Sequence, residues 1–153
     1  MSLHVALVAP EIPWNTGNVG RSAVAAGARL HLVRPLGFRL DHRHVKRAGL
    51  DYWQHVDPKV WAGVDAFESA LPELGAAWFF SAEAELELWS LDLRPPTVLV
   101  FGSETAGLPP DVRDRHRGSL VRIPMSPGPI RSLNVSNAAA VALFEALRQR
   151  SAG

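Results

Sequence analysis

Short apolar segments alternate along this chain with segments of helical periodicity. The apolar segments, each of the length of a buried strand, cover residues 3–9, 30–33, 76–80, 97–101 and 120–123. Helices are expected over residues 16–26, 42–48, 65–71, 110–117 and 136–150. Strands that alternate with helices predict βαβ units. The fold class is therefore α/β, with a mainly parallel sheet and helices on both faces.

The composition is that of a globular protein. The chain has 153 residues, of which 47% are hydrophobic and 20% charged, and it contains no cysteine. The absence of cysteine excludes disulfide scaffolds, thiolate metal sites and cysteine nucleophiles. No apolar run has the length of a membrane span, and the N-terminus lacks the pattern of a signal peptide. We expect a single domain over residues 1–153 and a cytoplasmic location.

Segments rich in Gly, Pro, Asn, Ser and Thr follow several of the predicted strands, where an α/β sheet binds its ligands. These segments are also ordinary turn formers. A phosphate-binding Walker loop is excluded because no Gly-Lys-Ser/Thr closes residues 18–22. Residues 102–107 lack the central glycine of the dinucleotide fingerprint, and Arg34 stands where a ribose-binding acid is expected. The histidines show no metal-binding spacing beyond His42-x-His44, so we expect no metal.

Three motifs occur in order along the chain. They read Pro-Glu-Ile-Pro-x-Asn-Thr-Gly-Asn-Val-x-Arg at 10–21, Phe-Gly-x-Glu-x-x-Gly-Leu-Pro at 101–109, and Ile-Pro-Met at 123–125 followed by Arg-Ser-Leu-Asn-Val-Ser-Asn-Ala at 131–138. Together they resemble the SPOUT class of RNA methyltransferases. Arg-Ala-Gly-Leu-Asp-Tyr at 47–52 narrows the resemblance to the TrmL-type tRNA 2′-O-methyltransferases, which modify the wobble nucleotide. Trp14 and Ala106 depart from the usual pattern.

The resemblance implies a C-terminal trefoil knot that holds S-adenosyl-L-methionine, a homodimer, and tRNA bound through its anticodon region. The implied reaction transfers a methyl group to the ribose 2′-hydroxyl of nucleotide 34. One alternative is a 2′-O-methyltransferase for another tRNA or rRNA nucleotide. The other is a knotted RNA-binding protein without catalysis.

The residues that match the motifs are candidates for catalysis: Arg21, Asn15, Glu104, Ser132 and Asn134. The resemblance places Arg21 near the ribose, and because arginine stays protonated we favour a phosphate clamp over a general base. Structural roles remain open for the others. Asn15 can form a turn or a cap, and Ser132 and Asn134 can cap the last helix. Glu104 can bind loop amides or polar groups of the donor, or it can cap a helix.

The methyl donor requires a slot with apolar walls and backbone groups. By position, the residues expected to form it are Phe80, Gly102, Ile123, Ser132 and Leu133. Gly102 is expected there because it lets the backbone approach a ligand. A run of basic side chains between residues 39 and 47 is the candidate RNA surface, and a solvated helix face is the alternative. The predicted RNA-binding residues are Asn18, Arg39, Arg43, Lys46, Arg47, Tyr52 and Arg131.

Overall fold

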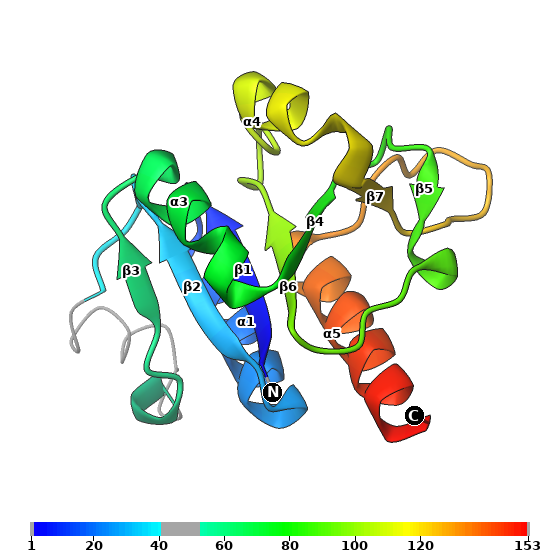
Figure 1. The fold of residues 1–153 in the computed structure, drawn as a ribbon. Helices are drawn as coiled ribbons and strands as arrows, with labels where there is room; N and C mark the ends of the chain where they lie inside the picture. The colour runs from blue at the N-terminus through cyan, green and yellow to red at the C-terminus, as the bar shows by residue number, and fades with distance from the viewer. Residues whose placement is uncertain (1, 41–52, 153) are drawn as a thin grey trace.

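A seven-stranded parallel sheet forms the centre of the molecule in the computed structural model, which describes residues 2–40 and 53–152. The strand order is β3-β2-β1-β6-β4-β7-β5 (Figure 1). The strands are β1 (Leu3–Val8), β2 (Arg29–Val33), β3 (Lys59–Trp61), β4 (Ala76–Phe80), β5 (Leu86–Glu87), β6 (Thr97–Phe101) and β7 (Leu120–Arg122). The prediction of a parallel α/β sheet is confirmed. The helix expected over residues 42–48 lies outside the described residues.

The sequence did not predict the two edge strands. β3 has three residues and β5 has two, and neither contains an apolar run. Each pairs with only one neighbouring strand, β3 with β2 and β5 with β7. Strands this short at an edge leave too little periodic pattern to be recognised, because their pairing depends on the strand beside them.

Alternate residues of the central strands face two separate hydrophobic clusters. Val5 and Leu7 of β1 pack in the cluster that includes helices α1 (Pro13–Ala26) and α5 (Val135–Ala152). Ala6 and Val8 face the opposite cluster, which is covered by α3 (Val64–Leu74) and joined by Val112 of α4 (Pro110–Arg115). Figure 1 shows α3 and the α1–α5 pair on opposite sides of the sheet. The prediction of helices on both faces is therefore confirmed.

Helix α1 begins three residues earlier than the sequence pattern suggested. We expected a start at Thr16 with Asn15 or Thr16 as N-cap, but Pro13 occupies the first turn and Ile12 is the N-cap residue. A proline is suited to this position, since its missing N–H has no partner within a helix start. The expected C-terminal glycine is confirmed: Gly27 has φ 73°, and the N–H of Ala28 donates to the Ala23 carbonyl at 2.8 Å.

Helix α5 buries a face made of three alanines and one leucine and exposes larger apolar side chains elsewhere. Its core face consists of Ala139, Ala142, Leu143 and Ala146, all buried. The predicted apolar stripe of Val141, Phe144 and Leu147 could have served the core or an interface. Val141 and Phe144 are 36% and 43% exposed, so they are not core residues of this chain.

The carboxyl ends of the parallel strands meet at one edge, which lies at the top of Figure 1. β6 lies between β1 and β4, and β7 lies between β4 and β5. The loops after β1, β6 and β7 therefore come together, although they are far apart in the sequence. The two chain ends lie at the opposite side of the molecule.

Candidate active site

A cavity of about 490 Å³ opens among the loops at this edge. Its volume is within the range of roughly 300–1,000 Å³ that small-molecule sites occupy. The walls come from the segments after β4, β6 and β7 and from the start of α5. The predicted site residues that line it are Asn15, Phe80, Gly102, Glu104, Ile123, Ser132, Leu133 and Asn134. These residues were predicted at strand ends or in motif loops, and the fold brings them to one cavity.

One wall of the cavity is aromatic and apolar. The rings of Phe80 and Phe101 stack with centroids 4.4 Å apart and an interplanar angle of 12°. Leu108, Val121 and Ile123 complete this wall. A flat apolar surface of this kind is suited to a planar heterocycle, because stacking buries its faces without requiring polar partners.

The carboxylate of Glu104 holds the first-motif loop in place. Its two oxygens accept the backbone N–H groups of Glu11 and Ile12, each at 2.9 Å. The side-chain amide of Asn15 donates to the same carboxylate at 3.2 Å. Glu104 therefore binds loop amides, which is one of the interpretations that the sequence allowed, and these amides belong to the segment that leads into α1.

Asn15 and Asn134 continue this network to the last helix. The Asn134 amide donates to the Asn15 side-chain oxygen at 3.1 Å. The other end of Asn134 accepts the N–H groups of Ser136 at 2.9 Å and Asn137 at 3.3 Å, as an N-cap side chain does. Asn134 thus caps α5 and also links it to the first-motif loop.

Glu11 and Thr105 form a second link between the same two loops. The sequence did not indicate a role for either residue. The Glu11 carboxylate accepts the backbone N–H of Thr105 at 3.1 Å and its hydroxyl at 2.6 Å. These bonds hold the pKa of the Glu11 carboxyl below its ordinary value. The sequence shows one acidic residue in each of these two motifs, Glu11 and Glu104. It does not show that each carboxylate binds the other loop, because that pairing depends on the fold.

The second-motif loop leaves no space for a side chain at Gly102. A Cβ atom at this position would lie 2.1 Å from the carbonyl carbon of Gly107 and 2.1 Å from the nitrogen of Leu108. The second-motif loop folds back on itself here, with Ser103 and Gly107 bridged by two backbone hydrogen bonds. The glycine therefore makes room for the loop's own backbone. It also lines the cavity, and its expected role of letting the backbone approach a ligand stays a prediction.

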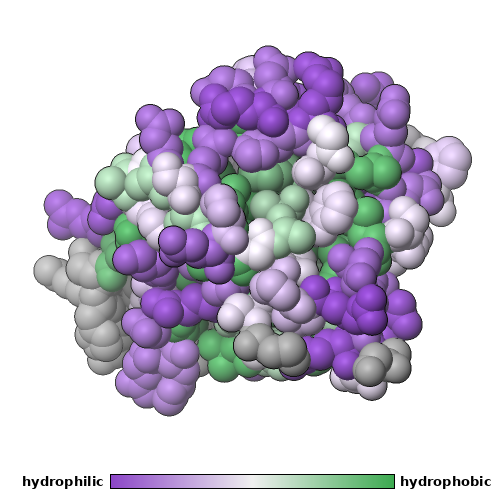
Figure 2. Space-filling model, in the orientation of Figure 1, coloured by the Kyte–Doolittle hydropathy of each residue, from purple (hydrophilic) through white to green (hydrophobic). Residues whose placement is uncertain are grey.

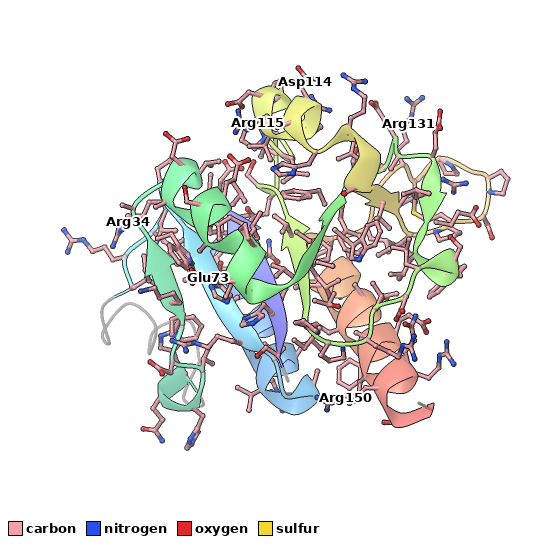
Figure 3. All side chains as sticks on the ribbon, viewed as in Figure 1. Arg34, Glu73, Asp114, Arg115, Arg131 and Arg150 are labelled. Carbon is pink, nitrogen blue, oxygen red and sulfur yellow. The ribbon has the colours of Figure 1, made fainter. Side chains whose placement is uncertain are left out.

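Among the residues that the structure describes, the other predicted ones do not line the cavity. Arg21 is an exposed residue of α1, and Asn18 is exposed one turn before it. Arg39 is exposed beyond β2, and Arg131 is exposed in the loop before α5, where Figure 3 shows it at the rim of the molecule. Arg43, Lys46, Arg47 and Tyr52 lie outside the described residues.

The residues that the structure describes were also compared with the requirements of a membrane span and of a metal site. None of their helices is both long and apolar enough to cross a membrane. In this part of the chain, no cluster of three His, Cys, Asp or Glu side chains is placed to bind a metal ion.

Comparison with known proteins identifies the family. The model of the SpoU rRNA Methylase family matches residues 2–144. A tRNA (cytidine(34)-2′-O)-methyltransferase of Burkholderia ambifaria is 48% identical over 148 residues, which cover 95% of this chain and 94% of that protein.

Solved structures of methyltransferases have the same fold as this chain. One, described as "Structural insights into the 2-OH methylation of C/U34 on tRNA", superposes with a TM-score of 0.90 at 47% identity and covers 99% of this chain and 98% of its own. An AdoMet-bound rRNA methyltransferase of Sinorhizobium meliloti has a TM-score of 0.83 at 30% identity, covering 96% of this chain and 56% of its own. Sequence, fold and cavity lead to one conclusion: this chain belongs to the SpoU rRNA methylase family.

Proposed function

We propose that this protein transfers a methyl group from S-adenosyl-L-methionine to the ribose 2′-hydroxyl of the wobble nucleotide, position 34, of tRNA. The observation that carries the proposal is the 48% identity, over nearly the whole of both chains, to a relative named for this reaction. The cavity supports it, because it gathers residues of all three motifs at one edge of the sheet.

The cavity fits the donor. S-adenosylmethionine supplies a methyl group on a sulfonium centre, which is already activated for transfer. The stacked Phe80 and Phe101 rings and Ile123 offer apolar walls to an adenine. Ser132 and Leu133 border the cavity from the loop before α5, and the loop around Gly102 adds backbone groups. These residues exclude water and orient the reacting methyl group.

Arg21 acts on the RNA side of the reaction. Its exposed position on α1, outside the cavity lining, supports contact with the substrate rather than with the donor. A guanidinium stays protonated at neutral pH, so Arg21 cannot serve as a base in that form. We propose that it holds a phosphate beside the target ribose and that the Glu104–Asn15–Asn134 network orients the start of α1 that carries it.

RNA binding extends over exposed residues around this edge. Asn18, Arg39 and Arg131 are exposed and suited to phosphate contacts. Arg43, Lys46, Arg47 and Tyr52 are proposed for the same surface from the sequence alone. The anticodon region is the part of tRNA that presents nucleotide 34.

A homodimer, a C-terminal trefoil knot and a single domain over residues 1–153 complete the proposal, with a cytoplasmic location where tRNA is modified. The exposed apolar side chains of Trp14 on α1 and Val141 and Phe144 on α5 support dimerisation, because α1 and α5 pack side by side. A second copy would cover these side chains. Sedimentation at micromolar concentration is expected to give twice the 16.7 kDa chain mass, and a monomer alone would contradict the dimer.

The function is tested by nucleoside mass spectrometry of tRNA from a deletion strain, together with methyl transfer in vitro. The deletion is expected to remove 2′-O-methylation at nucleotide 34. Arg21→Ala is expected to bind S-adenosylmethionine normally and to lose methyl transfer. Arg150→Ala removes an arginine at the far end of α5 and serves as the matched control (Figure 3). Loss of methylation at a different tRNA or rRNA position would assign another target, and donor binding without any transfer would indicate a non-catalytic RNA-binding protein.

A further inference from the structure

Arg113 stands out among the charged residues of α4. The short helix also carries Asp111, Asp114 and Arg115. Arg115 pairs with Asp111 at 3.2 Å and with Glu68 of α3 at 2.6 Å, and Asp114 pairs with Arg117 at 2.8 Å. Within the described part of the chain, the Arg113 side chain has no hydrogen bond and no ion pair.

The position of Arg113 makes this lack of a partner significant. Its side chain is half-buried and lines the cavity, whereas the outer surface over α4 is strongly hydrophilic (Figure 2). A surface arginine without a partner is hydrated on all sides. A guanidinium in the wall of a partly apolar cavity keeps less water and gains more from an anionic ligand.

Among the described residues, the other charged groups that line the cavity already have partners. They are Glu104, whose carboxylate accepts three N–H groups, and Arg122, which pairs with Glu87 at 2.7 Å. The cavity therefore has a satisfied carboxylate on the first-motif side and an unpaired cation from α4. A ligand that matches this pattern presents a single anionic group to Arg113.

We propose that Arg113 binds the carboxylate of the methionine portion of the donor. This inference rests on the proposed binding of S-adenosylmethionine in the cavity. The carboxylate is the one anionic group of that molecule, since its ammonium and sulfonium groups are positive. An arginine fork matches a carboxylate with two parallel N–H···O bonds, which fixes the orientation of the group as well as binding it.

The same chemistry could serve an RNA phosphate, but the position of Arg113 favours the small ligand. Arg34, Arg39 and Arg131 are exposed, as expected of groups that contact a phosphate backbone on a surface. Arg113 instead borders the volume that the donor is proposed to fill. Phosphate contact is therefore the competing outcome of the test.

The test compares two ligands and two arginines by calorimetry. The ligands are S-adenosylmethionine and its decarboxylated form, which lacks only the carboxylate. Arg113→Ala is expected to weaken binding of S-adenosylmethionine about ten- to a hundredfold, the effect of losing a charged hydrogen-bonded pair. The same variant should bind the decarboxylated ligand as the unmodified protein does. Arg113→Lys should recover part of the affinity, because it keeps the charge without the fork.

Arg117→Ala is the matched control, since it removes a neighbouring exposed arginine whose partner is Asp114. It should bind both ligands normally. Equal loss of both ligands in Arg113→Ala would overturn the carboxylate assignment, as would unchanged affinity for both. Unchanged donor affinity with weaker, less salt-dependent tRNA binding would assign Arg113 to a phosphate instead. If the unmodified protein bound neither ligand, the proposed function itself would fail.

Discussion

Replacement of Glu104 by alanine tests whether this carboxylate holds the candidate active site together. The substitution removes the acceptor of the Glu11 and Ile12 N–H groups and of the Asn15 amide. A hydrogen bond to a charged group contributes about 1.5–3 kcal/mol, and the Glu11 bond is exposed enough for water to replace it. The two partly buried bonds, from Ile12 and Asn15, then set the expected loss of unfolding free energy, about 3–6 kcal/mol.

Glu104→Gln separates charge from shape. The amide keeps one acceptor oxygen but turns an NH₂ group toward a backbone donor, so we expect a loss of about 1–3 kcal/mol. Glu73→Ala on the outer side of α3 is the control, because Glu73 is exposed (Figure 3). That change should stay within about 0.5 kcal/mol.

Urea unfolding followed by far-UV circular dichroism measures these differences, and calorimetry with S-adenosylmethionine follows the cavity. Both Glu104 variants should weaken donor binding in the order of their effect on stability, because the same loops line the cavity. If Glu104→Ala were as stable as Glu73→Ala, the network would not hold the loops, and our reasoning would be wrong.

Two other features give measurable expectations. Burial lowers the pKa of His31 to about 4, and its ring contacts His4 at 2.8 Å and accepts the Trp61 N–H at 3.0 Å. The unfolded chain then binds more protons between pH 6.5 and 4, so stability should fall as the pH drops through that window, by up to about 3 kcal/mol. Urea titrations across this range should show a shallower fall for His31→Phe, and equal pH dependence of the two proteins would contradict the assignment. Gly102→Ala should lose at least about 2 kcal/mol and most donor affinity, since its Cβ would overlap the facing backbone, whereas Gly118→Ala meets no neighbour within 4 Å and should do neither. A Gly102→Ala variant as stable as Gly118→Ala would show that the loop can open without cost.

The sequence predicted the parts of the fold that have their own periodicity. The five predicted strands and the two helices that pack on each other, α1 and α5, have enough apolar residues to be recognised without their neighbours. The edge strands, such as Lys59–Trp61, do not, and their pairing depends on β2 and β7. The start of α1 was misplaced because Asn15 resembles an N-cap but is used by Glu104 instead.

The sequence predicted most of the residues of the candidate site but not the hydrogen bonds that connect them. Strand ends and motifs indicated which side chains gather at one edge. The partners could not be deduced, since Glu11 and Thr105 are separated by 94 positions and contact each other only through the order of β1 and β6. The sequence likewise could not predict a binding role for Arg113. That role depends on which neighbouring charged residues pair with one another and leave Arg113 without a partner.

The interleaved strand order has a consequence for the synthesis of this protein. β6 enters between β1 and β4, and β7 enters between β4 and β5, so strands made late complete gaps between strands made early. Asn134, which joins the first-motif loop to α5, is made later still. An emerging chain therefore has no finished donor cavity until nearly all of it has left the ribosome. A chain truncated before residue 132 would lack the cavity wall that Ser132, Leu133 and Asn134 supply, so donor binding would report that folding has included this C-terminal segment.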